Sequence, residues 1–145
     1  MIRPYNKPDV DSILHIWLNA SIQAHNFISS NYWESKQEDM KNIYLPASET
    51  YIYEDDTTKE ILGFISLVDN YLAAIFVEPG NQGKGIGTLL LNHVKAIREE
   101  LTLHVYLENS SSVDFYTKNG FVVSDQQTDH NTGAQELKMK WSRKN

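Results

Sequence analysis

The stretch Gln82-Gly83-Lys84-Gly85-Ile86-Gly87 decides how the rest of the chain is interpreted. It follows an apolar run at 72–77 and precedes an amphipathic run at 88–101, an order typical of a strand, a glycine-rich turn and a helix. Backbone N–H groups at a helix N-terminus have no helical partner, and the aligned peptide dipoles add partial positive charge there. Glycine permits positive φ and lets a ligand reach the backbone without meeting a Cβ. The stretch therefore predicts an anion site suited to phosphate.

Two well-known phosphate loops fit this stretch incompletely. The Walker pattern fails because Ile86 stands where that pattern requires lysine. The dinucleotide pattern Gly-x-Gly-x-x-Gly is met by Gly83 and Gly85, but Thr88 takes the third glycine position. Glu108, after the next strand-like run, could mimic the acid that binds a ribose. A dinucleotide-binding domain therefore remains an alternative.

Length and composition predict one ordinary globular domain spanning residues 1–145. The chain is 41% hydrophobic and 22% charged, which is typical of a packed domain. It has no cysteine, so disulfides, thiolate zinc sites and cysteine nucleophiles are excluded. This composition fits a reducing cytoplasm, and we expect a cytoplasmic protein.

The charge pattern narrows the classes of partner. The net charge is −6 and lysine and arginine form no cluster, so we expect no nucleic acid partner. The N-terminus has no signal-peptide core, and the apolar run at 72–77 is too short to cross a membrane, so we expect no membrane partner. Because the protein is negatively charged, binding of an anionic cofactor would depend on local backbone amides. A cationic amine, in contrast, would be attracted by the net charge.

The first half of the chain predicts two helices after a short strand at 2–5. Apolar residues recur at helical spacing over 8–21, and a second helix is expected over 33–44 with Trp33, Met40 and Ile43 facing inward. Between them, the aperiodic segment 22–31 is rich in aromatic and polar residues.

The second half alternates strands and helices. A period of two predicts strands, and a helix over 88–101 carries an apolar stripe that includes Ile97 and Leu101. Ser111 to Asp114 form a capping box that starts a short helix. The remaining strands are expected at 50–54, 61–68, 72–77, around 103–107, at 121–124 and at 136–141, with a loop at 128–133. The order is β-α-α-β-β-β-α-β-α-β-β, with parallel pairing around the helix at 88–101.

Two motifs and this order together resemble the GNAT N-acetyltransferases. Gln82, Gly85 and Gly87 match the family loop Gln/Arg-x-x-Gly-x-Gly/Ala in full. The segment 109–116 resembles the family pattern Asn-x-x-Ala-x-x-Phe-Tyr, with Ser112 in place of alanine. The resemblance covers the whole chain and implies the GNAT fold, an α/β (α+β) architecture with a mixed sheet of about seven strands flanked by about four helices.

The resemblance implies an acetyl-CoA-dependent N-acetyltransferase that works by direct transfer in a ternary complex. Asn109 would bond the pantetheine arm, and Tyr116 would protonate the departing thiolate. Tyrosine suits that role because its ordinary pKa of about 10 lies above the value of about 8.5 for a thiol. The residues expected to bind the cofactor are Phe76, Val77, Gln82, Gly83, Lys84, Gly85, Ile86, Gly87, Thr88, Asn109, Ser112, Phe115 and Tyr116.

Acyl transfer also needs an oxyanion donor and a base for the amine. The strand at 71–77 is the candidate for backbone N–H donors, and Glu78 at its end is the candidate base, acting directly or through water. His25, Phe27, Tyr71 and Ala73 are the candidates for the acceptor side.

The partner is expected to be an amine-bearing protein or small molecule. The spacing of the histidines suggests no metal site, and none is expected. The chain is expected to be a monomer or a homodimer. A non-catalytic acyl-CoA-binding module is a further alternative, against which Tyr116 argues.

Overall fold

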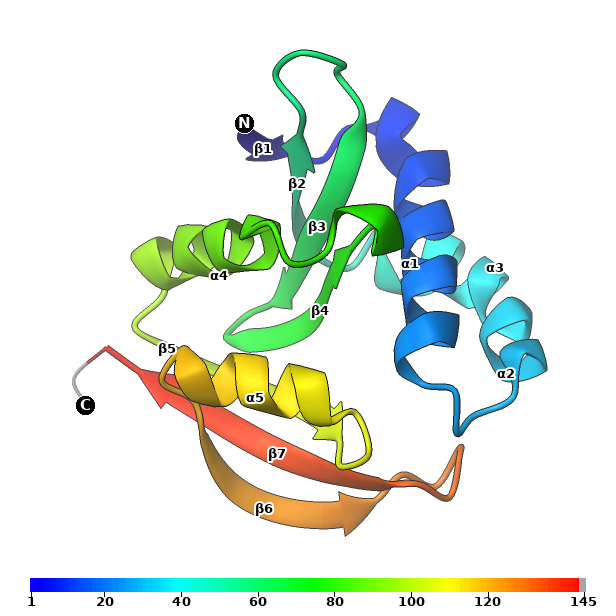
Figure 1. Ribbon diagram of the computed structural model, residues 1–145, viewed down its shortest axis with the longest axis vertical. Helices are drawn as coiled ribbons and strands as arrows, with labels where there is room; N and C mark the ends of the chain where they lie inside the picture. Colours follow the sequence, from blue (N-terminus) through cyan, green and yellow to red (C-terminus); the bar gives the residue numbers. More distant parts are fainter. Residues whose placement is uncertain (144–145) are drawn as a thin grey trace.

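The computed structural model describes residues 1–143. They fold around one mixed seven-stranded sheet (Figure 1). The strand order is β1-β2-β3-β4-β5-β7-β6, and within the described chain only β4 and β5 pair in parallel. This confirms the predicted fold class. The strands are β1 (Ile2–Pro4), β2 (Glu49–Glu54), β3 (Ile61–Val68), β4 (Tyr71–Val77), β5 (Glu100–Tyr106), β6 (Val122–Thr128) and β7 (Gln135–Ser142).

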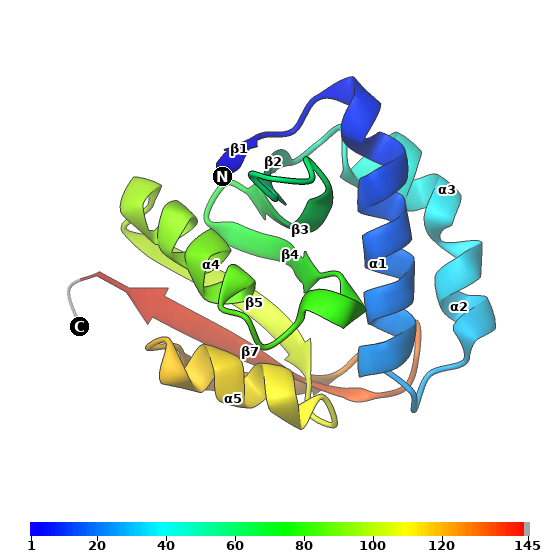
Figure 2. The same cartoon turned by 45° about the horizontal axis from the view of Figure 1, so that its top comes forward.

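The helices cover both faces of this sheet (Figure 2). Successive strand residues point to opposite faces. In β3, Phe64 packs towards α1 while its neighbour Ile65 packs towards α4, and both side chains are fully buried. No helix in the described part of the chain is long and apolar enough to cross a membrane. The helices are α1 (Val10–Ala24), α2 (Ser30–Ser35), α3 (Gln37–Asp39), α4 (Ile86–Ile97) and α5 (Ser110–Lys118).

The sheet opens between its two parallel strands. β4 and β5 share one registered pair, Tyr71 with Thr102, among the described residues. Helix α4 forms the connection between them, and a helical crossover is how parallel neighbours are joined. Beyond that pair, the edge of β4 that faces β5 has no ladder partner in the described part of the chain, so its backbone groups are free to bond a ligand.

The predicted helix over 88–101 is too long. Helix α4 ends at Ile97, and Arg98 is already extended with φ −134° and ψ 149°. Leu101 belongs to β5, where it pairs with Trp141 of β7 and is fully buried, whereas Ile97 is 43% exposed. The period-two alternation of Leu101, Leu103 and Val105 therefore determines the structure, because it places all three against the core.

The second predicted helix, 33–44, is interrupted. Ser29 is the N-cap of α2, which begins at Ser30. This helix ends before Lys36, and α3 begins after Lys36. A wider π turn then spans Met40–Tyr44, and it rotates Ile43 outward to 55% exposure, although Trp33 and Met40 are buried as predicted. The prediction for Ile43 is wrong because it assumed one continuous 3.6-residue period.

The edge strand β6 is longer than predicted. It continues past Ser124 to Thr128 by pairing with β7, with a bulge between Val123 and Asp125. All seven residues of β6 are exposed. A strand without an apolar face has no alternation that sequence patterns can reveal.

Candidate active site

The glycine-rich stretch forms an open turn at the N-terminus of α4. Gly85 is the N-cap residue with φ 87°, and Gly83 has φ 81°, so both use the left-handed region that glycine tolerates. A Cβ at either position would meet no atom of the described residues within 4 Å. No side chain of residues 1–143 caps the helix by a hydrogen bond, so its first N–H groups are left available to a ligand. This is the geometry of an anion site.

Gly87 has a different role in the same stretch. A Cβ there would lie 3.4 Å from Cζ of Phe115 and 3.9 Å from Cγ2 of Val77, so the glycine lets a side chain of α5 approach α4. Gln82 Nε2 donates to the backbone oxygen of Val77 at 3.1 Å. The turn is thereby tied to the end of β4, and Phe115 lies beside it.

Asn109 opens α5 on the other side of the parted strands. Its Oδ1 accepts from the backbone N–H of Ser112 at 3.4 Å and from the Ser111 hydroxyl at 3.3 Å. The predicted capping box at Ser111 is therefore wrong by two residues, because asparagine is the better N-cap available. Asn109 is 6% exposed, and its Nδ2 lies 3.2 Å from Nε2 of His25.

Tyr116 is buried on the inner face of α5. Its ring packs edge-on against Phe115 and Phe121, with centroids 5.4 and 5.5 Å away. Burial raises the pKa of the Tyr116 phenol well above its usual value, and the nearby Tyr71 adds to the effect. The hydroxyl therefore stays protonated at neutral pH, as a proton donor must.

His25 lies in an aromatic cluster at the end of α1. It stacks on Trp33 at 5.1 Å and meets Tyr106 and Phe27 edge-on at 5.1 and 5.9 Å. Burial lowers the pKa of His25 to about 4, so the ring is neutral at physiological pH. The sequence placed this histidine on the acceptor side. The structure buries it and brings it to Asn109.

Glu78 caps the short turn that follows β4. Its Oε2 accepts from the backbone N–H of Gly80 at 3.0 Å and from Nδ2 of Asn81 at 2.8 Å. The candidate base is thus partly engaged in holding the backbone. It also borders an open cavity of about 480 Å³ between α1 and the β2–β3 hairpin.

The remaining β4 candidates lie at different depths. Tyr71 donates or accepts a hydrogen bond with Nδ1 of His104 at 2.8 Å, and Ala73 is exposed. Phe76 packs on Phe64 in the α1 layer, with centroids 5.8 Å apart, so its side chain lies on the α1 side of the sheet. Lys84 Nζ donates to Asn81 Oδ1 at 3.3 Å, and Thr88 is exposed in the first turn of α4.

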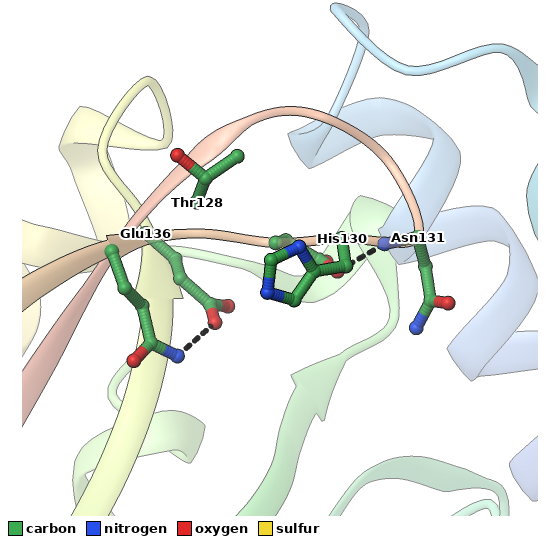
Figure 3. A pocket seen from close by; sticks show the side chains of 6 residues that line it. Thr128, His130, Asn131 and Glu136 are labelled. Atoms are coloured by element: carbon green, nitrogen blue, oxygen red, sulfur yellow. Dashed lines mark hydrogen bonds between the residues drawn. The ribbon is translucent and has the colours of Figure 1, made fainter.

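The β6–β7 turn supplies a polar cavity that the sequence did not predict (Figure 3). It measures about 620 Å³ and includes Asp129 and Glu136. Tyr106 donates to Oδ2 of Asp129 at 2.6 Å. Although burial alone would raise the pKa of Asp129, this bond helps to keep it below its usual value. The lining residues are Gln127, Thr128, Asp129, His130, Asn131 and Glu136.

The turn itself is a loop of polar residues with no periodic signal, and only the folded structure shows that Asp129 and Glu136 line one cavity. Among residues 1–143, no group of three or more histidine, cysteine or acidic side chains is arranged to hold a metal ion.

A family model for the acetyltransferase (GNAT) domain matches residues 46–123, which is more than half of the chain. The chain therefore belongs to the GNAT acetyltransferase family. It is an N-acetyltransferase that depends on acetyl-CoA, as the two motifs had indicated. The family assignment favours neither the dinucleotide-binding alternative nor the non-catalytic one.

Named relatives are similar over most of their length. The peptidyl-lysine N-acetyltransferase YiaC of Escherichia coli is 33% identical over 126 residues, covering 86% of this chain and 85% of the relative. A spermidine N(1)-acetyltransferase of Thermoplasma acidophilum is 30% identical over 146 residues, covering 86% and 89%.

Solved structures share the fold. The solution structure of apo YjaB from Escherichia coli superimposes with a TM-score of 0.85 at 24% identity, covering 97% of this chain and 96% of that one. The PaiA N-acetyltransferase of Thermoplasma acidophilum, solved with coenzyme A, gives a TM-score of 0.80 at 24% identity and 98% coverage of both chains. These similarities confirm the predicted GNAT fold.

Proposed function

We propose that this enzyme transfers the acetyl group of acetyl-CoA to the side-chain amine of a protein lysine. The observation that carries the proposal is the uncapped, glycine-lined N-terminus of α4 beside the parted strands β4 and β5, with Asn109 and Tyr116 on their far side. A single extended cofactor would therefore pass the anion site at α4, then the opening between β4 and β5, and then the proton donor Tyr116.

The cofactor is held mainly by backbone. The N–H groups of 83–88 bind the pyrophosphate, which compensates for a protein whose net charge is −6. Phe115 and Ser112 border the pantetheine arm, and the backbone of Phe76 and Val77 meets it from β4. The free edge of β4 supplies N–H donors to the oxyanion that forms when the amine attacks the thioester.

Tyr116 returns a proton to the leaving thiolate. Its raised pKa does not oppose this role, because the same burial also disfavours a thiolate formed beside it. The amine nitrogen forms the new bond to the acetyl carbon and releases its second proton to water, the carbon–sulfur bond breaks, and the sulfur takes the phenolic proton. Bulk solvent restores that proton after coenzyme A leaves.

The amine must arrive uncharged. Before it loses its proton, the ammonium form of the amine is attracted by Asp129 and Glu136 at the β6–β7 turn. The aromatic face of Phe27 borders the same end of the sheet. Glu78 Oε1 accepts no hydrogen bond among the described residues, so this oxygen can receive the amine proton, directly or through water. Tyr71 and Ala73 complete the acceptor side on β4.

A protein lysine is favoured over a polyamine on two grounds. The relative named as a peptidyl-lysine acetyltransferase is 33% identical, against 30% for the spermidine enzyme. The cavity at the β6–β7 turn is open, so a side chain presented on a protein surface can enter it. A cysteine-free chain is compatible with a cytoplasmic enzyme that meets such substrates.

The test compares amines at equal concentration. Purified enzyme and acetyl-CoA are mixed with a lysine peptide, with the same peptide carrying arginine in place of lysine, or with spermidine. Release of coenzyme A and the mass of the product are measured. We expect acetylation of the lysine peptide alone at a substantial rate. Preference for spermidine, or no transfer to either amine, contradicts the proposal.

A further inference from the structure

A hydrogen bond joins two buried side chains that are 84 positions apart in the sequence. His25, at the end of α1, is 7% exposed, and Asn109, at the start of α5, is 6% exposed. Nε2 of His25 lies 3.2 Å from Nδ2 of Asn109. Burying two polar groups is costly unless they bond each other, so this contact contributes to the arrangement of both helices.

The direction of this bond is fixed by Asn109. Its Oδ1 already accepts from Ser112 and Ser111, which leaves the amide nitrogen to face His25. An amide nitrogen can only donate, so Nε2 of His25 accepts and the ring proton lies on Nδ1, a buried atom that has no hydrogen-bond partner among the described residues. Of the two Nδ2 hydrogens, one goes to His25, and no other acceptor among the described residues takes the second.

The histidine ring is itself held in place. Trp33 stacks on it, and Tyr106 and Phe27 close its edges. A ring packed on several sides cannot turn Nε2 away from Asn109 without moving α2 or β5. The neutral state that burial imposes keeps the accepting lone pair present at physiological pH.

We propose that His25 is a positioning residue that orients the Asn109 amide, so that its second N–H points to the pantetheine arm of acetyl-CoA. This inference rests on the proposed function, in which Asn109 bonds that arm. It assigns His25 to the cofactor and not to direct contact with the amine. Through the Asn109 cap, it also fixes the first turn of α5, and Phe115 and Tyr116 project from the next turn of the same helix.

Two substitutions separate hydrogen bonding from packing. His25→Phe keeps an aromatic ring among its neighbours and loses the acceptor, whereas His25→Gln keeps an acceptor oxygen and loses the ring. Calorimetry measures the affinity of each variant for coenzyme A and for 3′-phospho-ADP, which lacks the pantetheine arm. A hydrogen bond contributes about 0.5–1.5 kcal/mol, so its loss corresponds to a change of about two- to tenfold.

We expect His25→Phe to lower the affinity for coenzyme A by about two- to tenfold and to leave the affinity for 3′-phospho-ADP unchanged. His25→Gln should recover most of the loss. In an Asn109→Ala background, His25→Phe should have no further effect on coenzyme A, because the two residues act through one bond. Unchanged coenzyme A affinity in His25→Phe, or equal losses for both ligands, overturns the proposal.

Nitrogen-15 spectra of the histidine rings in the parent protein give a test that needs no variant. His25 should carry its proton on Nδ1, and a proton on Nε2 overturns the proposal. The lysine-peptide assay on the parent separates this inference from the proposed function. A parent that acetylates the peptide while His25→Phe binds coenzyme A normally refutes the role of His25 alone. A parent that binds coenzyme A through His25 but acetylates no amine refutes the function alone.

Discussion

The two sides of the site are built in opposite ways. The turn at 82–88 is contiguous, open to solvent and made of backbone N–H groups that glycines leave accessible. The junction of His25 with Asn109 joins residues 84 positions apart and is buried side chain throughout. The cofactor binding that we propose for the turn therefore depends on a few local φ angles. The positioning and proton transfer that we propose for α5 depend instead on tertiary packing, and should respond to burial and to pH.

The largest effect is expected on the side-chain half of the site. Tyr116→Phe keeps the ring against Phe121 and removes only the hydroxyl, so the fold should survive. General acid catalysis is worth about 10²–10⁴-fold, and we expect the turnover rate to fall by that amount while acetyl-CoA affinity barely moves. Steady-state kinetics and calorimetry measure the two quantities.

Tyr53→Phe is the matched control for Tyr116→Phe. Tyr53 lies on β2 and packs against the same core, so its substitution removes a phenol hydroxyl at a distance from α5. It should leave the rate unchanged. If Tyr116→Phe also retained full activity, Tyr116 would be a packing residue and another group would supply the proton.

The next largest effect is expected at the glycine-rich turn, which is the backbone side of the site. Gly85→Val adds a branched side chain at φ 87°, in the open space where the turn is proposed to hold pyrophosphate. Bonds to a charged group contribute about 1.5–3 kcal/mol each, so losing one should weaken acetyl-CoA binding by about tenfold to about 150-fold. Calorimetric titration measures the change.

Gly133→Val controls for backbone strain in that experiment. Gly133 has φ 76° in the β6–β7 turn, and a Cβ there also meets no atom within 4 Å. Both variants carry a similar conformational cost, but only Gly85 lies at the helix N-terminus. Equal cofactor affinities in the two variants would place the pyrophosphate elsewhere.

The smallest effect is a pH dependence of stability that only the buried junction should show. Since the folded-state pKa of His25 is about 4 and the unfolded value is about 6.5, the unfolded chain binds the extra proton over that window. Stability is therefore lost as the pH falls, by about 2 kcal/mol between about pH 7.5 and about pH 5. Urea unfolding should show this loss in the parent and its absence in His25→Gln. An equal loss in both proteins would mean that another group titrates.

Sequence patterns predicted the parts of the site that are local. Three glycines before an amphipathic run are enough to define the turn, and the motif ending in Tyr116 identified α5 and its inner face. The sequence could not show that His25 meets Asn109, because no local period links them. Nor could it show Asp129 beside Tyr106, since this contact depends on how β6 and β7 pair.

Two of the boundaries that failed did so where two signals overlapped. Leu101 continued the apolar stripe of the preceding helix and also began the alternation of a strand, and burial of Leu103 and Val105 decided in favour of the strand. Around Ser111, two residues could have capped α5, and Asn109 does so while also bonding His25. In both cases, two local structures were compatible with the sequence pattern, and tertiary contacts determined which of them formed.

An amide-resolved titration tests most directly whether the turn at 82–88 holds the cofactor. Nitrogen-15-labelled protein is titrated with acetyl-CoA while the backbone amide of every assigned residue is followed. We expect the largest shifts at Gly83, Gly85 and Thr88, smaller ones at Asn109 and Tyr116, and almost none on β1. Shifts concentrated at the β6–β7 turn, with the amides of 82–88 unmoved, would contradict the assignment of the site.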